Sequence, residues 1–134
     1  MLTTATFRSS AFNTTEVKPY FINPFCFGDD LAKWMIARLR DIGIRTEDEP
    51  GQEDFGWYFN FGVAAGKHCC VLGYQDDGPE GKWRLWLERN RGLIGSIVGR
   101  RSSGIDSAAI QVVQSILSNA PEIQELEWQE GKFR

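Results

Sequence analysis

The sequence has few of the features that mark secreted, membrane-spanning or metal-binding proteins. Its 134 residues include only 3 cysteines, an odd number, and its N-terminus has no basic stretch followed by an apolar one. No segment approaches the run of roughly 18 apolar residues that a transmembrane helix needs. Secretory signals and paired cysteines are the marks of exported small proteins. We therefore expect a soluble, unsecreted protein of the cytoplasm with reduced thiols and no membrane partner.

Residues for metal or nucleophilic chemistry are also scarce. The only histidine is His68, and two of the cysteines, Cys69 and Cys70, are adjacent. Neighbouring strand residues point to opposite faces and the Cys-x-x-Cys spacing of zinc sites is absent, so we expect no metal and no cofactor. A cysteine nucleophile would need His68 to reach Cys26 or Cys70. No motif favours such an enzyme, although the sequence leaves catalysis open.

The charge excludes a generally basic binding protein. The net charge is -3, so the field of the whole molecule favours neither nucleic acid nor anionic membranes. Residues 82–101 are an exception, with six Lys and Arg residues against Glu88 alone. Their Gly-rich part, 91–104, lacks the Gly-Lys-Ser/Thr ending of a P-loop. We interpret it as a solvated loop or short helix facing an acidic turn, with a phosphate or acidic protein as the alternative ligand.

What the sequence does contain is the pattern of one folded domain. Hydrophobic residues make up 42% of the chain, with 5 Trp and 9 Phe, enough for one core. Helical spacing of apolar residues predicts helices over 29–42, capped by Asp29 and stopped by Gly43, and over 105–118, capped by Asp106. Alternation and turn residues predict strands near 44–46, 55–64, 68–75, 82–89 and 123–128, the middle three as an antiparallel meander joined by turns at 65–67 and 76–81.

This order of elements predicts an α+β fold. Two amphipathic helices would pack on one face of a mostly antiparallel sheet within a single domain, 1–134. Residues 1–20 show strand-like content without clear periodicity, and 129–134 are expected to form a tail. The other face of the sheet would then be open, unless the N-terminal segment covers it.

That open face is the best functional clue. Alternation places Phe55, Trp57, Phe59 and Phe61 on the core side with Trp83, Leu85 and Leu87. If no bulge intervenes, the opposite side carries Tyr58, Asn60, Cys70, Leu72, Tyr74, Arg84, Trp86 and Glu88. Trp, Tyr and Arg dominate the energetics of interfaces. We predict a non-catalytic protein-binding or self-associating module, a homodimer in the second case, that uses Tyr58, Asn60, Tyr74, Arg84, Trp86 and Glu88. Cross-strand pairs that merely stabilise an exposed sheet are the alternative.

An acidic turn offers the competing function. Five carboxylates fall within 47–54, among them Glu53 and Asp54. Paired carboxylates perform acid/base work or hold a divalent cation, but runs of charge commonly form solvated faces. The alternative hypothesis is a small enzyme or ligand-binding protein with a pocket around Glu53, Asp54 and His68.

Three segments resemble a family of small, uncharacterised bacterial proteins. They are 28–34 (GDDLAKW), 52–58 (QEDFGWY) and 85–89 (LWLER), in this order, and the resemblance spans about 20–128. It implies a bacterial cytoplasmic protein of one domain, and it brings no activity, cofactor or catalytic residue. In size and lack of a catalytic motif the chain is also similar to bacterial toxin-immunity proteins.

Overall fold

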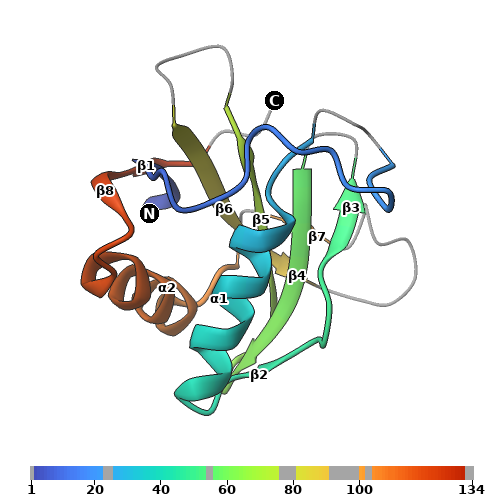
Figure 1. Cartoon of the computed structure of the whole chain (residues 1–134). Coiled ribbons are helices and arrows are strands. Elements are labelled where there is room, and N and C mark those ends of the chain that lie inside the picture. The colour runs from blue at the N-terminus through green and yellow to red at the C-terminus, as the bar shows by residue number, and fades with distance from the viewer. Residues whose placement is uncertain are drawn as a thin grey trace.

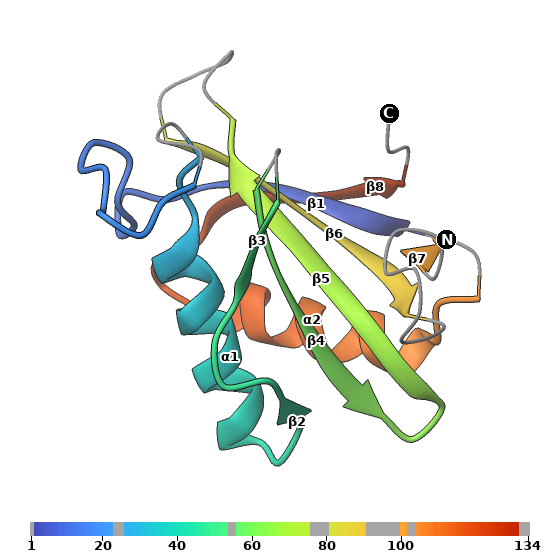
Figure 2. The same ribbon diagram turned by 90° about the vertical axis from the view of Figure 1, so that its right-hand side faces the viewer.

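The computed structural model describes residues 2–22, 26–53, 56–75, 81–90, 100–101 and 104–131. The elements in chain order are β1 (Leu2–Arg8), α1 (Asp29–Asp41), β2 (Arg45–Thr46), β3 (Gly51–Glu53), β4 (Gly56–Val63), β5 (Gly66–Tyr74), β6 (Lys82–Asn90), β7 (Arg100–Arg101), α2 (Ser107–Asn119) and β8 (Gln124–Glu130). Both helices lie on one side of the sheet (Figures 1 and 2). The predicted α+β fold is therefore confirmed.

The strands form one antiparallel sheet. Its order is β2-β4-β5-β6-β1-β8, while β3 also pairs with β4 and β7 with β6. The predicted meander corresponds to β4, β5 and β6. The N-terminal strand β1 lies between β6 and β8, which corrects the expectation of an ill-defined segment over 1–20. The predicted tail is also shorter, because β8 extends to Glu130.

The starts of the two helices differ in their caps. The N-cap of α1 is Gly28, not Asp29 as predicted. Gly28 has φ 139°, and an added Cβ would lie 3.0 Å from the Leu72 side chain, so glycine is required there. Asp29 instead accepts a 2.5 Å hydrogen bond from the Tyr20 hydroxyl, which raises the pKa of Tyr20 to about 12. At α2 the prediction is confirmed, because the Asp106 side chain accepts a hydrogen bond from the Ala108 N–H at 2.9 Å.

The main core lies between the sheet and the helices. Its buried side chains include Phe7, Leu31, Met35, Leu39, Phe59, Phe61, Cys70, Leu72, Trp83, Leu85, Leu87, Val113 and Leu117. Cys70 and Leu72 were expected on the other face. The β4–β5 hairpin turns at 64–65, one residue earlier than predicted, and pairs Phe59 with Cys70 and Trp57 with Leu72. A shift of one residue in the turn moves every side chain of the following strand to the opposite face.

The N-terminal segment 9–22 packs on the helix side of the molecule. The Phe12 ring contacts Trp34 and Trp83, and the Phe21 ring contacts Trp57. Polar contacts hold the segment as well: the Asn13 N–H donates to Asp30 at 2.7 Å, and the Gln52 amide bonds both the Tyr20 carbonyl and the Ile22 N–H at 2.7 Å. The alternative that this segment covers the opposite face of the sheet is wrong.

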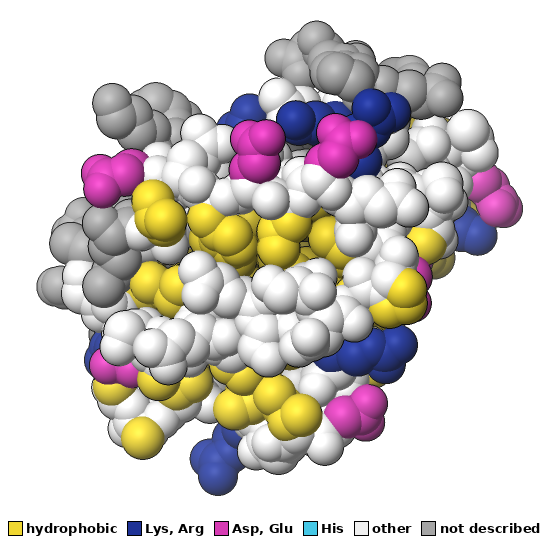
Figure 3. Space-filling view, turned by 90° about the vertical axis from the view of Figure 1, so that its left-hand side faces the viewer, with side chains coloured by type: hydrophobic (Ala, Val, Ile, Leu, Met, Phe, Trp, Pro, Cys, Tyr) yellow, Lys and Arg dark blue, Asp and Glu magenta, His cyan; other side chains and the backbone are white. Residues whose placement is uncertain are grey.

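Apolar side chains also reach the surface at the border of the core. Figure 3 shows a strip of hydrophobic side chains on the side where β8 and α2 lie. Partly buried residues of these elements, such as Ile116, Leu126 and Trp128, pack against the main core. Neither helix in the described part of the chain has the length and apolar character to cross a bilayer.

Candidate functional site

We call the sheet surface opposite the helices the second face. Side chains on this face form rows across the strands, because directly paired residues of an antiparallel sheet point to the same side. One row contains Gly73, Arg84, Thr6 and Glu127, and the next contains Val71, Trp86, Thr4 and Gln129. The strand β1, with its alternating Thr4, Ala5, Thr6 and Phe7, thus contributes two hydroxyls to this face.

Part of the second face is a small apolar cluster. Cys69 and Val71 are completely buried, Trp86 is 7% exposed, and Tyr58 packs against them. The Trp86 indole N–H donates to Glu88 Oε2 at 2.8 Å, and Glu88 is 6% exposed. The expectation of an open second face is therefore wrong for this part. Trp86 and Glu88 belong to a packed unit, so their removal affects folding as well as any binding.

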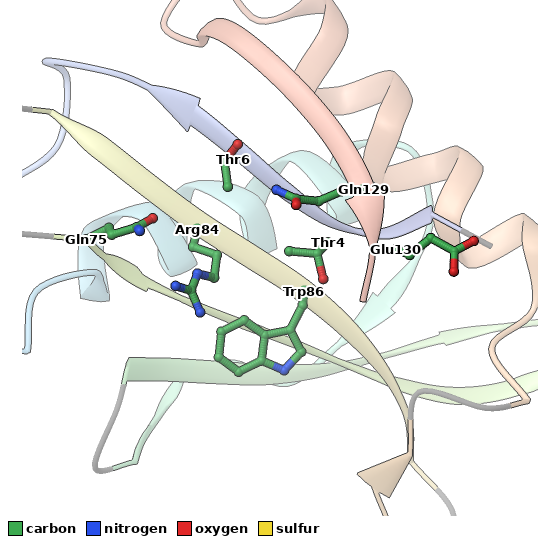
Figure 4. Close-up of a pocket in the computed structure, with 7 residues that line it drawn as sticks. All are labelled: Thr4, Thr6, Gln75, Arg84, Trp86, Gln129 and Glu130. Atoms are coloured by element: carbon green, nitrogen blue, oxygen red, sulfur yellow. The ribbon is translucent and has the colours of Figure 1, made fainter. Parts of the chain in front are cut away.

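Next to this cluster lies a cavity of about 450 Å³ that we call the sheet groove. It is lined by Thr4, Thr6, Gln75, Arg84, Trp86, Gln129 and Glu130 (Figure 4). In Figure 4, Arg84 and Gln75 lie toward one end and Glu130 at the other. Because the lining comes from β1, β6, β8 and the end of β5, only the folded sheet brings these side chains together.

The sheet groove contains polar groups that the fold leaves without partners. Among the described residues, Thr4 Oγ1 and Gln75 Oε1 are buried and make no hydrogen bond. The exposed Arg84 has no ion pair or hydrogen bond in the described part of the chain. A buried polar atom without a partner costs about 1–3 kcal/mol. Three groups that can bind a ligand therefore converge on one cavity.

The structure separates the residues that the sequence placed in one binding surface. Arg84 and Trp86 line the sheet groove, whereas Tyr58 and Glu88 belong to the apolar cluster beside it. Tyr74 lies on the helix-covered face, where its hydroxyl accepts a hydrogen bond from the Gly81 N–H at 3.2 Å and its ring lies 5.1 Å from that of Trp83. Its assignment to the binding surface was wrong because of the shorter β4–β5 turn.

Asn60 is on the second face, but it has a structural role. Its backbone N–H and its side-chain amide donate to the two oxygens of Glu47, each at 3.0 Å. Glu47 lies between β2 and β3, which pair with β4 on either side of this position. The Glu47 carboxylate thus takes the place of a backbone partner where the pairing along β4 is interrupted.

Other carboxylates of the acidic turn are bound in the same region. Asp48 pairs with Arg40 at 2.6 Å, and Glu49 pairs with Lys33 at 4.0 Å. The backbone carbonyl of Glu53 accepts a hydrogen bond from the Cys26 thiol, with Sγ at 3.8 Å. Asp54 lies outside the described residues, as does most of the predicted basic loop 91–104. No cluster of three potential metal ligands occurs in the described part of the chain.

His68 is an anchor for α2 and lies on the helix-covered face. It is completely buried, and its Nε2 accepts a hydrogen bond from the Asp106 N–H at 3.0 Å. Since Nε2 accepts, Nδ1 carries the proton and donates to the Gly66 carbonyl at 3.1 Å. Burial lowers the pKa of His68, which favours the neutral ring. Both nitrogens are occupied, so His68 in this conformation has no free position from which to act as a base.

Cys70 is not an activated thiol. Burial raises the pKa of Cys70 well above its usual value, which opposes formation of the nucleophilic thiolate. None of Cys26, Cys69 and Cys70 forms a disulfide. In this conformation neither Cys70 nor His68 is therefore poised for nucleophilic chemistry.

The residues that the sequence interpretation missed are Thr4, Thr6, Gln75, Gln129 and Glu130. A signal for two of them was present, since Thr4 and Thr6 alternate with the apolar Ala5 and Phe7 in the manner of a half-buried strand. Comparison with known protein families, curated proteins and solved structures found no match to this chain.

Proposed function

We propose that the protein is a non-catalytic protein-binding module whose partner docks on the second face at the sheet groove. The observation that carries this proposal is that, among the described residues, the Arg84 guanidinium has no ion pair and lies in one cavity with Thr4 Oγ1 and Gln75 Oε1, which are buried and make no hydrogen bond. Arginine beside an aromatic residue is enriched among the residues that dominate interface energetics. A partner that satisfies these groups gains hydrogen bonds that the free protein lacks.

The environments of His68 and Cys70 are more consistent with a binding role than with catalysis at these residues. Burial lowers the pKa of His68 and raises that of Cys70, and both ring nitrogens of His68 are bonded to backbone groups. The three cysteines form no disulfide, which agrees with the reducing cytoplasm that we propose as the compartment. The alternative of an acidic pocket around Glu53 and Asp54 has less support, because Glu47, Asp48 and Glu49 beside it hold the sheet edge and α1.

The partner is either another protein or a second copy of this chain, and one set of variants distinguishes them. Wild type, Arg84→Ala and the control Arg45→Ala would be immobilised and exposed to lysate of the source cell, with captured proteins quantified by mass spectrometry. Arg45 is also an exposed arginine, but it lies on β2 at the far end of the sheet order. We expect a protein that wild type and Arg45→Ala retain and that Arg84→Ala loses.

Sedimentation velocity on the purified proteins tests self-association. A dimer of wild type and Arg45→Ala that dissociates in Arg84→Ala would identify the second copy as the partner. If Arg84→Ala retains every partner and every oligomer that wild type forms, the second face is not the docking surface and the proposal is wrong.

A further inference from the structure

We infer that the sheet groove recognises a carboxylate with a neighbouring N–H donor, the chemistry of an acidic or C-terminal residue in a peptide. The inference rests on the proposed function, because it assigns a ligand class to the same groove. Its volume of about 450 Å³ lies within the roughly 300–1,000 Å³ typical of ligand pockets.

Arg84 supplies the positive charge for the carboxylate. A guanidinium presents parallel N–H donors whose spacing matches the two carboxylate oxygens. Gly73 lies opposite Arg84 on β5 and has no side chain, while the short Thr6 lies opposite on β1. Small neighbours on both sides leave room for a ligand group to approach the guanidinium.

Thr4 and Gln75 define the rest of the ligand. Thr4 is only 8% exposed, lines the groove, and its Oγ1 has no hydrogen-bond partner among the described residues. Its hydroxyl can donate to a carboxylate oxygen, whereas Gln75 Oε1 can only accept, and in a peptide ligand a backbone N–H is the donor that can satisfy it. A carboxylate alone would leave Gln75 Oε1 unsatisfied, so the ligand carries both groups.

The distribution of charge along the groove fixes the orientation of the ligand. Arg84 carries positive charge at one end of the groove, and the carboxylate of Glu130 lies at the opposite end (Figure 4). The Trp86 indole N–H is already bonded to Glu88, so it is not available to the ligand. The carboxylate therefore lies at the Arg84 end, with the remainder of the ligand directed along β6 and β1 toward Glu130.

Titration of the isotopically labelled full chain, followed by amide NMR shifts, tests this inference with three small probes. N-acetylglycine offers a C-terminal carboxylate, N-acetyl-aspartate N-methylamide offers a side-chain carboxylate, and N-acetyl-asparagine N-methylamide is neutral. We expect at least one carboxylate probe to shift the amides of Thr4, Gln75 and Arg84 at a concentration at which the neutral probe does not. The probe that binds more tightly identifies the source of the carboxylate.

Variants connect the shifts to the groups invoked. Arg84→Gln should lower the affinity for the carboxylate probe by at least about tenfold, because hydrogen bonds to charged groups contribute about 1.5–3 kcal/mol. Thr4→Val keeps the shape of the side chain. It should lower the affinity for the probe by about threefold or more, since it removes one hydrogen bond. Arg45→Gln, at the distant β2, should leave the affinity unchanged.

The inference is overturned if the neutral probe binds as well as the carboxylates, if the shifts map away from the groove, or if Arg84→Gln leaves the affinity unchanged. These results are separable from failure of the proposed function. A partner retained through Arg84 but not displaced by the carboxylate probe would leave the docking face correct and its ligand chemistry wrong. If Arg84→Ala still retained the partner, the docking face itself would be wrong.

Discussion

Alternate residues of β6 serve two different surfaces. Trp83, Leu85 and Leu87 point to the helices and are completely buried in the main core. On the second face, Arg84 is exposed, while Trp86 is buried in the small cluster. One strand therefore contributes both to the interior that holds the fold together and to the surface that is available for recognition.

The two faces also differ in how their polar groups are satisfied. On the helix-covered face, both nitrogens of His68 have partners and the Trp57 indole N–H donates to the Cys26 carbonyl at 2.8 Å. The Trp34 and Trp128 indoles have no partner in the described structure, but neither lines the sheet groove. In the groove, Thr4 Oγ1 and Gln75 Oε1 make no hydrogen bond, and Arg84 beside them has no ion pair among the described residues. Two of the four buried atoms without partners in the described structure therefore lie in one cavity, whereas the two indoles lie elsewhere.

The largest test of this contrast is truncation of the helix-covered face. Trp83→Ala should reduce the free energy of unfolding by about 3–5 kcal/mol, because it leaves a large cavity in the core. The variant also removes the indole donor to the Ser9 carbonyl, whose present distance is 3.4 Å. Urea denaturation followed by circular dichroism measures the change. Trp83→Phe is the matched control and should cost less; a small effect of Trp83→Ala would show that the helix side is not the main source of stability.

The pH dependence of stability tests the role of His68. Burial lowers its pKa from the usual 6.5, so below that pH the unfolded chain binds a proton that the folded chain does not. The free energy of unfolding should therefore fall as the pH drops below 6.5, and continue to fall until the pKa of the folded state is reached. Nearby charges act in both directions, since Arg89 lowers this pKa and Asp106 raises it.

Denaturation midpoints between pH 7.5 and 5, compared with those of His68→Gln, isolate this contribution. The variant keeps a polar side chain but has no titrating ring, so its stability should depend less on pH over this interval. Equal pH dependence of the two proteins would mean that His68 does not remain neutral in the fold.

The sequence was sufficient to predict the fold class because that inference needs only local patterns. Helical spacing located α1 and α2, and turn residues separated the strands of the meander. The faces of β5 were harder, because they depend on the length of a single hairpin turn. With a turn at 64–65, Tyr74 and Leu72 face the helices and Cys69 and Val71 face the second side.

The candidate site was harder to predict, because its residues are brought together by long-range pairing. Arg84 and Trp86 could be found from alternation within one strand. Thr4 and Gln129 join them only because β1 inserts between β6 and β8, a crossover that no local pattern specifies. The contact between Asn60 and Glu47 is likewise non-local, because Glu47 reaches Asn60 only where the pairing of β4 changes from β2 to β3.

A smaller effect of opposite sign is expected within the sheet groove. Thr4→Val should increase the free energy of unfolding by about 1 kcal/mol, because it removes a buried hydroxyl that has no hydrogen bond while preserving its shape. Thr6→Val is a matched control on the same strand and face, since Thr6 is equally buried at 8% but its Oγ1 is not among the buried partnerless atoms. Thermal denaturation of the three proteins measures the difference. Destabilisation by Thr4→Val alone would indicate that the hydroxyl is satisfied in the free protein.

The smallest effect on stability is expected at Arg84, although it is the residue on which the proposed recognition depends most. Arg84→Ala should change the free energy of unfolding by no more than about 0.5 kcal/mol, because the side chain is exposed and has no ion pair among the described residues. Its neighbour Trp83 provides the contrast, since the two differ by one position and by the face that they occupy. Urea denaturation of Arg84→Ala beside Trp83→Ala therefore compares the two surfaces within one strand. A loss above about 1.5 kcal/mol for Arg84→Ala, a value typical of buried sites, would place Arg84 in the folding core and remove the distinction between the two faces.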